Sequence, residues 1–155
     1  RPQLMQIIED HTLVFFTGRT RSASELLAQQ SKDLVTINRK LLMRRMVELA
    51  FDLKDELESN SITNFGQILH ENWVLKSQLT KGITDPEIDS WYSEGMKNGA
   101  LGGKLLGAGN GGFIMFFAPP EKHDLIAKSL TNLQRVKFKF DRNGSQIVHY
   151  QPIIK

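Results

Sequence analysis

Glycines concentrate in one short segment of this chain, where the sequence carries its clearest chemical pattern. Seven of the twelve glycines lie between residues 99 and 112, and five of them lie in residues 103–112. Glycine permits a positive φ, and without a Cβ it lets backbone N–H groups approach an anionic ligand closely. A tight connection under closely packed helices would use glycine in the same way. Because so many glycines fall together, we expect this loop to be placed for function and not for packing alone.

Two familiar phosphate-binding patterns are excluded by the residues around these glycines. Gly107, Gly109 and Gly112 satisfy the pattern G-x-G-x-x-G, but its use in dinucleotide binding requires a helix directly afterwards and an acidic residue about twenty positions on. The chain continues instead with the strand-forming run Phe113–Phe117. No Gly-Lys-Ser/Thr closes a Walker A loop either. The sequence therefore predicts a glycine loop between two strands.

A second candidate site contains two arginines that follow a short apolar run. Arg19 and Arg21 directly precede residues 22–25, whose Ser-x-x-Glu pattern is typical of a capping box that opens a helix. A helix N-terminus and two guanidinium groups can together bind an anion. Thr17 and Thr20 can donate hydroxyl hydrogen bonds to the same pocket. The alternative is that the arginines are solvated loop residues and the threonines only satisfy the turn.

Three further residues are spaced to share one face of a helix. His70, Trp73 and Ser77 follow each other by three and four positions. In a sugar site Trp73 would stack on the ring and His70 would bond a hydroxyl, whereas in a core both would be structural. The four histidines have no metal-ligand spacing, so we predict no metal site, and we assign His70 no general-base role. Lys104 is expected to flank the glycine loop with its charge in solvent.

The elements that position these residues follow from hydrophobic periodicity and from turn residues. Up to the glycine loop we expect a strand over 13–16, a helix from Ser22, helices over 38–59 and 62–79, and a helix that Asp85-Pro86 opens and Gly99 ends. After the loop we expect the strand Phe113–Phe117, a helix with Ile126, Leu130 and Leu133 inward, a strand alternating at Val136, Phe138 and Phe140, the turn Asn143-Gly144 and a return strand over 147–150. This order of strands and helices predicts an α+β fold.

The composition is that of one folded domain. The 155 residues are 40% hydrophobic and 24% charged, which excludes a disordered chain. The lack of cysteine excludes disulfides, thiolate metal sites and cysteine nucleophiles. The net charge of +3 favours a small anionic ligand over nucleic acid. No apolar run approaches the roughly 20 residues of a membrane helix, and no signal-like segment is visible, so we expect a cytoplasmic protein without a membrane or nucleic-acid partner.

The glycine loop and other segments resemble one family of enzymes. The pattern G-x-L-L-G-A-G-x-G-G at residues 103–112, followed by an aromatic-rich strand, resembles the third motif of the GHMP kinases. Residues 15–24, 69–76 and 99–105 resemble the D-glycero-D-manno-heptose 7-phosphate kinase branch of that superfamily. The resemblance implies a GHMP-kinase C-terminal domain over residues 1–155, with a ferredoxin-like layer of antiparallel strands packed with helices. It places five loop residues near the phosphates: Gly107, Ala108, Gly109, Gly111 and Gly112.

The resemblance also implies a partner domain. GHMP kinases carry an N-terminal nucleotide-binding domain with a Pro-x-x-x-Gly-Leu-Gly-Ser-Ser-Ala-like loop, and nothing in these 155 residues matches it. We therefore expect that domain to lie outside this chain. It would hold most of the ATP and Mg²⁺ and carry the catalytic residues, and this segment alone would be inactive.

The complete enzyme that this resemblance implies would transfer the γ-phosphate of ATP to heptose 7-phosphate, giving heptose 1,7-bisphosphate. The two arginines would hold the phosphate of the acceptor. The substrate-binding candidates are Thr17, Arg19, Thr20, Arg21, His70 and Trp73. Two alternatives stay open: a GHMP kinase for another acceptor, such as fucose, galactose or mevalonate, and a non-catalytic α+β binding module with Lys137 and Lys139 as a basic face.

Overall fold

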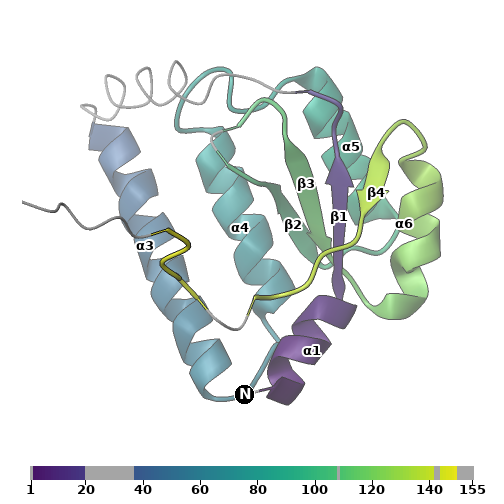
Figure 1. The fold of residues 1–155 in the computed structure, drawn as a ribbon. Coiled ribbons are helices and arrows are strands. Elements are labelled where there is room, and N and C mark those ends of the chain that lie inside the picture. Colours follow the sequence, from purple (N-terminus) through teal and green to yellow (C-terminus); the bar gives the residue numbers. More distant parts are fainter. Residues whose placement is uncertain (1, 20–36, 108, 142–143, 150–155) are drawn as a thin grey trace, which may run out of the picture.

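A four-stranded antiparallel sheet forms the centre of the fold (Figure 1). The computed structural model describes residues 2–19, 37–107, 109–141 and 144–149. The strands are β1 (Thr12–Phe16), β2 (Gly102–Leu105), β3 (Phe113–Phe117) and β4 (Gln134–Val136), in the spatial order β2-β3-β1-β4. The first strand in the chain therefore lies inside the sheet, between β3 and β4. The predicted α+β fold, a layer of antiparallel strands packed with helices, is confirmed.

The helices surround this sheet on several sides. They are α1 (Pro2–Asp10), α3 (Ile37–Glu58), α4 (Phe65–Ser77), α5 (Pro86–Lys97), the short 3-10 helix η1 (Pro120–Lys122) and α6 (His123–Ser129). In Figure 1, α4 lies beside the edge strand β2, α3 lies on the far side of α4, and α1 leads directly into β1. None of the helices that the structure describes is both long and apolar enough to cross a lipid bilayer.

Alternation along the strands sends apolar side chains into two buried clusters. Leu13, Phe15, Ile114 and Phe116 are at most 1% exposed and pack with side chains of α5 and α6. Phe117 points to the opposite face and joins a second cluster with side chains of α1 and α4. Burial on both faces therefore fixes the register of the central strands, because a slip of one residue would exchange the two sets.

Two pairs of close contacts bring α4 and α5 onto the sheet. A Cβ on Gly102 would lie 1.8 Å from the carbonyl oxygen of Gly66, so α4 rests directly on the backbone of β2. A Cβ on Gly95 would lie 2.3 Å from the ring of Phe116, so α5 rests directly on β3. At the start of α5, the Asp85 carboxylate accepts hydrogen bonds from the Glu87 and Ile88 N–H groups, as the predicted cap requires.

The predicted C-terminal hairpin is wrong in the residues that the structure describes. The strand expected over 136–140 ends at Val136, and residues 144–149 form no strand. Ile147 and Val148 are 85% and 94% exposed, so the apolar residues of the expected return strand cover no core. Instead, Glu9 of α1 accepts hydrogen bonds from the Lys139 ammonium (2.6 Å) and the Phe140 N–H (2.8 Å), which takes the chain away from the sheet.

The remaining element predictions are largely confirmed, with shifted ends. The helix expected over 38–59 is α3, and the helix expected over 62–79 is shorter at both ends, as α4. The helix after the two prolines buries Ile126, Leu130 and Leu133 as expected. Helix α1 was not predicted, although Leu4 and Ile8 have the spacing of a buried helical face. The helix expected from Ser22 lies outside the described residues.

Candidate functional site

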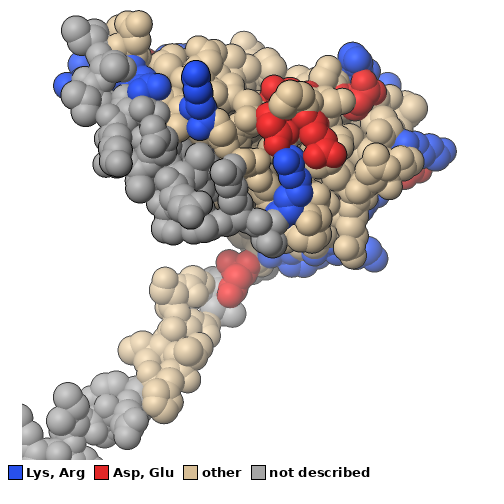
Figure 2. Space-filling view, turned by 90° about the horizontal axis from the view of Figure 1, so that it is seen from above, with Lys and Arg blue, Asp and Glu red and all other residues tan. Residues whose placement is uncertain are grey.

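The glycine loop lies at the end of the sheet where β1 ends, and hydrogen bonds join it to that strand. The N–H and the hydroxyl of Thr17 both donate to the Gly112 carbonyl, at 2.9 and 3.0 Å. The Gly112 N–H donates to the Arg19 carbonyl at 2.7 Å, and the Asn110 N–H donates to the Ile83 carbonyl at 2.8 Å. The structure thus brings together two sites predicted separately, the glycine loop and the Thr17–Arg19 turn. Figure 2 looks onto this end and shows acidic and basic side chains beside each other.

The backbone of the loop explains its composition. The described loop residues with a positive φ are Gly107 (83°), Gly109 (121°), Asn110 (59°), Gly111 (144°) and Gly112 (83°). Asn110 has a left-handed conformation, which a short polar side chain tolerates. No other non-glycine residue in this loop is described with a positive φ, and Ala108 lies outside the described residues.

The glycines of the loop differ in what surrounds them. A Cβ on Gly109 would lie 2.8 Å from the Ile83 carbonyl oxygen, and a Cβ on Gly111 would lie 2.8 Å from the Arg19 carbonyl oxygen. These two glycines are therefore needed for packing. Gly107 is exposed, and a Cβ there would meet nothing within 4 Å. Of these three positions, Gly107 is the one with open space beside the backbone.

Arg19 is already held by carboxylates at the start of α5. Its Nη2 lies 2.7 Å from Asp85 Oδ2, and its Nη1 lies 3.3 Å from Glu87 Oε2. The hydrogen bond to Asp85 raises the pKa of Arg19, and the same bond lowers the pKa of Asp85. Binding of an acceptor phosphate by Arg19 stays a prediction, and it would require the guanidinium to share or exchange these partners. Thr20 and Arg21 lie outside the described residues.

Two half-buried lysines lie beside the glycine loop, in an arrangement that was not predicted from the sequence. The ammonium of Lys76, in the last turn of α4, donates to the Gly107 carbonyl. The ammonium of Lys104, on β2, lies 3.3 Å from Asn72 Oδ1 of α4. Burial lowers the pKa of both lysines, and the charge of Lys104 lowers that of Lys76 further. Lys104 therefore flanks the glycine loop as expected, but its charge is partly buried against Asn72 instead of facing solvent alone.

His70, Trp73 and Ser77 do share a helical face, and it faces α5. They line a cavity of about 400 Å³ between the two helices, together with side chains of α5 that include Asp89, Tyr92 and Ser93. His70 Nδ1 lies 2.8 Å from the Tyr92 hydroxyl, which itself donates to the Gly103 carbonyl at 3.3 Å. Burial raises the pKa of Tyr92 above its ordinary value, so this phenol is a neutral link between α4, α5 and β2.

Trp73 has a different environment from the one expected for a sugar platform. Only 3% of the residue is exposed, and its ring lies 6.0 Å from the Tyr92 ring within the main core. Stacking on a sugar needs an open ring face. The role of Trp73 in substrate binding stays a prediction, and this burial favours the packing alternative.

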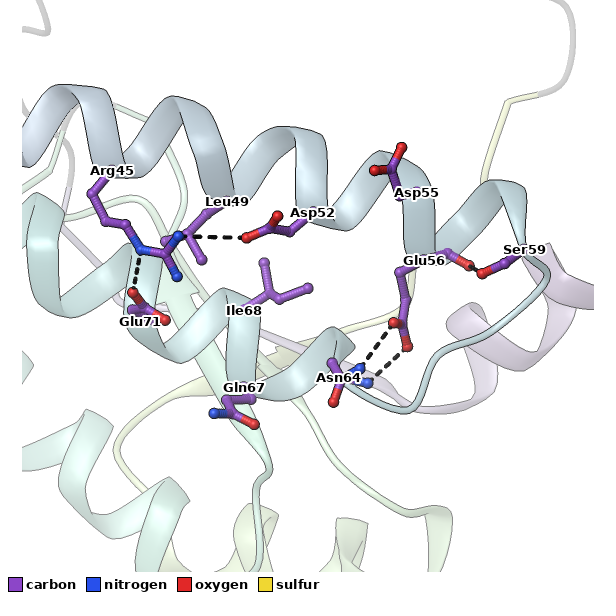
Figure 3. Close-up of a pocket in the computed structure, with 10 residues that line it drawn as sticks. All are labelled: Arg45, Leu49, Asp52, Asp55, Glu56, Ser59, Asn64, Gln67, Ile68 and Glu71. Atoms are coloured by element: carbon purple, nitrogen blue, oxygen red, sulfur yellow. Dashed lines mark hydrogen bonds and ion pairs between the residues drawn. The ribbon is translucent and has the colours of Figure 1, made fainter.

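A polar cavity of about 590 Å³ between α3 and α4 was not foreseen (Figure 3). Arg45 Nε lies 2.7 Å from Glu71 Oε1, and Arg45 Nη1 lies 3.6 Å from Asp52 Oδ2. Glu56 accepts hydrogen bonds from the backbone and the side chain of Asn64. The bond from the backbone N–H is the main reason that the pKa of Glu56 is lowered. These groups satisfy one another across the helix pair, so we assign the cavity a structural role in joining α3 to α4.

The cationic side chains near the glycine loop favour one kind of ligand. Within the residues that the structure describes, no three histidine, aspartate or glutamate side chains come together as a metal-binding group. Lys76, Lys104 and Arg19 are cations, which suit an anionic ligand and not a metal.

An antiparallel sheet with a glycine loop between β2 and β3 defines the class of α+β domain that the resemblance implied. The family model for the GHMP kinases C terminal matches residues 53–136, more than half of the chain. The chain belongs to this family.

The relatives of this chain include kinases with different acceptors. It is 29% identical, over 88% of its length, to the D-glycero-alpha-D-manno-heptose 7-phosphate kinase of Campylobacter jejuni, and it covers 41% of that protein. It is 29% identical, over 79% of its length, to the L-fucokinase/L-fucose-1-P guanylyltransferase of Bacteroides fragilis, of which it covers 13%. The chain therefore spans less than half of each of these two proteins.

A solved structure with low sequence identity to this chain confirms the fold. The L. major mevalonate kinase in complex with R-mevalonate superimposes with a TM-score of 0.72 at 23% identity, over 80% of this chain and 40% of that one. At this identity the likeness supports the fold alone.

Proposed function

We propose that this chain is the C-terminal domain of an ATP-dependent kinase that phosphorylates a sugar phosphate. The proposed reaction transfers the γ-phosphoryl group of ATP to the anomeric hydroxyl of D-glycero-D-manno-heptose 7-phosphate, giving the 1,7-bisphosphate. The observation that carries the proposal is the match to the GHMP family combined with a described glycine loop bound to the end of β1. The similarity to the heptose kinase of Campylobacter jejuni supports the choice of acceptor.

The proposed role of this domain is to position the acceptor and the phosphates. Phosphoryl transfer depends mainly on positioning and on neutralising the charge of phosphate oxygens, with little covalent chemistry by the protein. The loop around Gly107 and the Thr17–Arg19 turn would form one wall of the site. A nucleotide-binding domain outside this chain would supply the metal, most of the ATP contacts and the catalytic groups. We propose that the enzyme works in the cytoplasm.

The experiment that tests this proposal is a coupled ADP-release assay on the full-length enzyme. The acceptors are heptose 7-phosphate, unphosphorylated heptose, fucose, galactose and mevalonate. We expect the highest kcat/KM for heptose 7-phosphate, and no turnover from the 155-residue chain alone. A preference for fucose, which the Bacteroides fragilis relative makes the strongest rival, would change the acceptor but keep the enzyme class.

A non-catalytic binding module is the outcome that would contradict the proposal as a whole. It would show as no ADP release by the full-length protein with any acceptor. The basic face suggested for such a module is weakened by the structure, because the Lys139 ammonium lies 2.6 Å from Glu9 Oε2 and is neutralised by it.

A further inference from the structure

Lys76 and Lys104 are cations that the fold half-buries without a carboxylate partner among the described residues. Lys76 donates to a backbone carbonyl, that of Gly107, and Lys104 lies against the amide oxygen of Asn72. Two arginines of this chain are treated differently by the fold. Arg19 is paired with Asp85 and Glu87, and Arg45 is paired with Glu48, Asp52 and Glu71.

The acidic residue that is nearest in sequence to this pair is directed elsewhere. Glu71 precedes Asn72 on α4, but its carboxylate lies 2.7 Å from Arg45 Nε, in the cavity on the α3 side (Figure 3). The lysine ammonium groups therefore contact neutral oxygen atoms, and the charge of Lys104 acts on Lys76 by lowering its pKa. Partly burying two like charges is costly unless a counter-charge completes the site.

The surroundings of the lysines leave room for such a counter-charge. Gly107 is exposed and has open space where a Cβ would lie, directly beside the carbonyl that Lys76 contacts. The Asn110 and Gly112 N–H groups are turned inward, to the carbonyls of Ile83 and Arg19. An anion at the loop would therefore meet the lysine ammonium groups, while these two loop N–H groups stay engaged within the protein.

We propose that Lys76 and Lys104 together form a subsite for one phosphate group beside Gly107. The subsite deepens the proposed function and rests on it for the identity of the bound phosphate. That phosphate is either the 7-phosphate of the acceptor or a phosphate of the nucleotide. Both sources have the same chemistry, a phosphate ester or anhydride with oxygen atoms that accept from two ammonium groups. If the phosphate is the 7-phosphate of the acceptor, the role predicted from sequence for Arg19 falls to lysines on α4 and β2.

The test measures equilibrium binding to the full-length enzyme by calorimetry, without turnover. The probes are inorganic pyrophosphate, heptose 7-phosphate, unphosphorylated heptose and ADP. The variants are Lys76→Gln and Lys104→Gln, with Lys81→Gln as a matched control, because Lys81 is an exposed lysine in the α4–α5 connection. Circular dichroism and melting temperature verify the fold of each variant. If Lys104→Gln does not fold, the comparison of Lys76→Gln with Lys76→Arg, which keeps the charge, tests the subsite.

We expect at least a tenfold rise in the Kd of a phosphorylated probe in both glutamine variants, with heptose binding and the Lys81→Gln variant unchanged. Loss confined to heptose 7-phosphate assigns the subsite to the acceptor, and loss confined to ADP and pyrophosphate assigns it to the nucleotide. Unchanged affinity for every phosphorylated probe, or an equal loss in Lys81→Gln, would overturn the subsite. Failure of the proposed function is distinguishable, since it would appear as missing turnover while the pyrophosphate arm still reports on the lysines.

Discussion

The Arg19 guanidinium lies 2.7 Å from the Asp85 carboxylate, and that carboxylate also caps α5. One aspartate thus joins the end of β1 to the first turn of a helix 66 residues further along the chain. Because the glycine loop is bound to the same turn through Gly112 and Arg19, this pair holds together the whole end of the sheet on which the proposed site lies.

Two substitutions at Asp85 separate the cap from the ion pair. Asp85→Asn keeps a good N-cap and loses the charge, whereas Asp85→Ala loses both. We expect Asp85→Ala to lower the free energy of unfolding by about 1–2 kcal/mol, and Asp85→Asn by less than about 1 kcal/mol, since the pair is partly exposed to solvent. Urea unfolding of the full-length protein measures both. Equal losses in the two variants would contradict the separate contribution of the cap.

The ion pair also predicts how stability depends on pH. The pKa of Asp85 is lowered in the folded state, chiefly by the hydrogen bond from Arg19. Its contribution is therefore fully present above the ordinary aspartate pKa of about 4 and is lost as the pH falls through the lowered value. We expect the stability difference between wild type and Asp85→Asn to be constant from pH 6 to 7 and to shrink at about pH 3. A difference that grows on acidification would show that the charge does not stabilise the fold.

The parts of this fold that sequence predicts are those fixed by local patterns. The apolar run of β3 and the Asp85-Pro86 cap of α5 depend on neighbours within a few residues, and both are confirmed. The C-terminal hairpin had an equally clear local pattern, but Glu9 binds Lys139 from 130 residues away and the strand ends early. A good turn sequence does not create a strand when the apolar residues beside it have no core to pack against.

In the candidate site, too, only the features with a local sequence signal were predicted. Gly107 and its neighbours were found because glycine spacing is a local signal. The contact of Lys76 with Gly107, and that of Lys104 with Asn72, were not found, because each joins residues about thirty positions apart. Both depend on α4 lying directly on β2, which in turn needs the glycine pair at positions 66 and 102.

The glycines of the loop should respond differently to substitution. Gly109→Ala places a Cβ against the Ile83 carbonyl at a positive φ, so we expect it to lower the free energy of unfolding by about 1–3 kcal/mol. Gly107→Asn enters open space, and asparagine tolerates a positive φ, so its stability should stay within about 1 kcal/mol of wild type. If Gly107 borders the ligand, the same variant should raise the KM of a substrate at least fivefold. Normal kinetics in a folded Gly107→Asn enzyme would remove this position from the site.

The lysine pair makes a final prediction, in which stability and binding change in opposite directions. The pKa of each lysine is lowered in the folded state, so between that value and the ordinary lysine pKa of about 10.4 the unfolded chain holds more protons, and stability rises with pH. At pH values below that range, the burial and the mutual repulsion of the two charged lysines oppose folding.

Lys104→Met should therefore stabilise the ligand-free enzyme near pH 7, on the order of 1 kcal/mol or a few degrees in Tm, because it relieves Lys76 of a like charge. The same variant should bind pyrophosphate at least tenfold more weakly. In wild type, pyrophosphate should raise the Tm, since a ligand that binds only the folded state stabilises it. In Lys104→Met that increase should disappear. Scanning calorimetry with and without pyrophosphate measures the Tm of each protein and its ligand-induced increase. A variant that is less stable than wild type yet keeps the full ligand-induced increase in Tm would identify Lys104 as a structural residue.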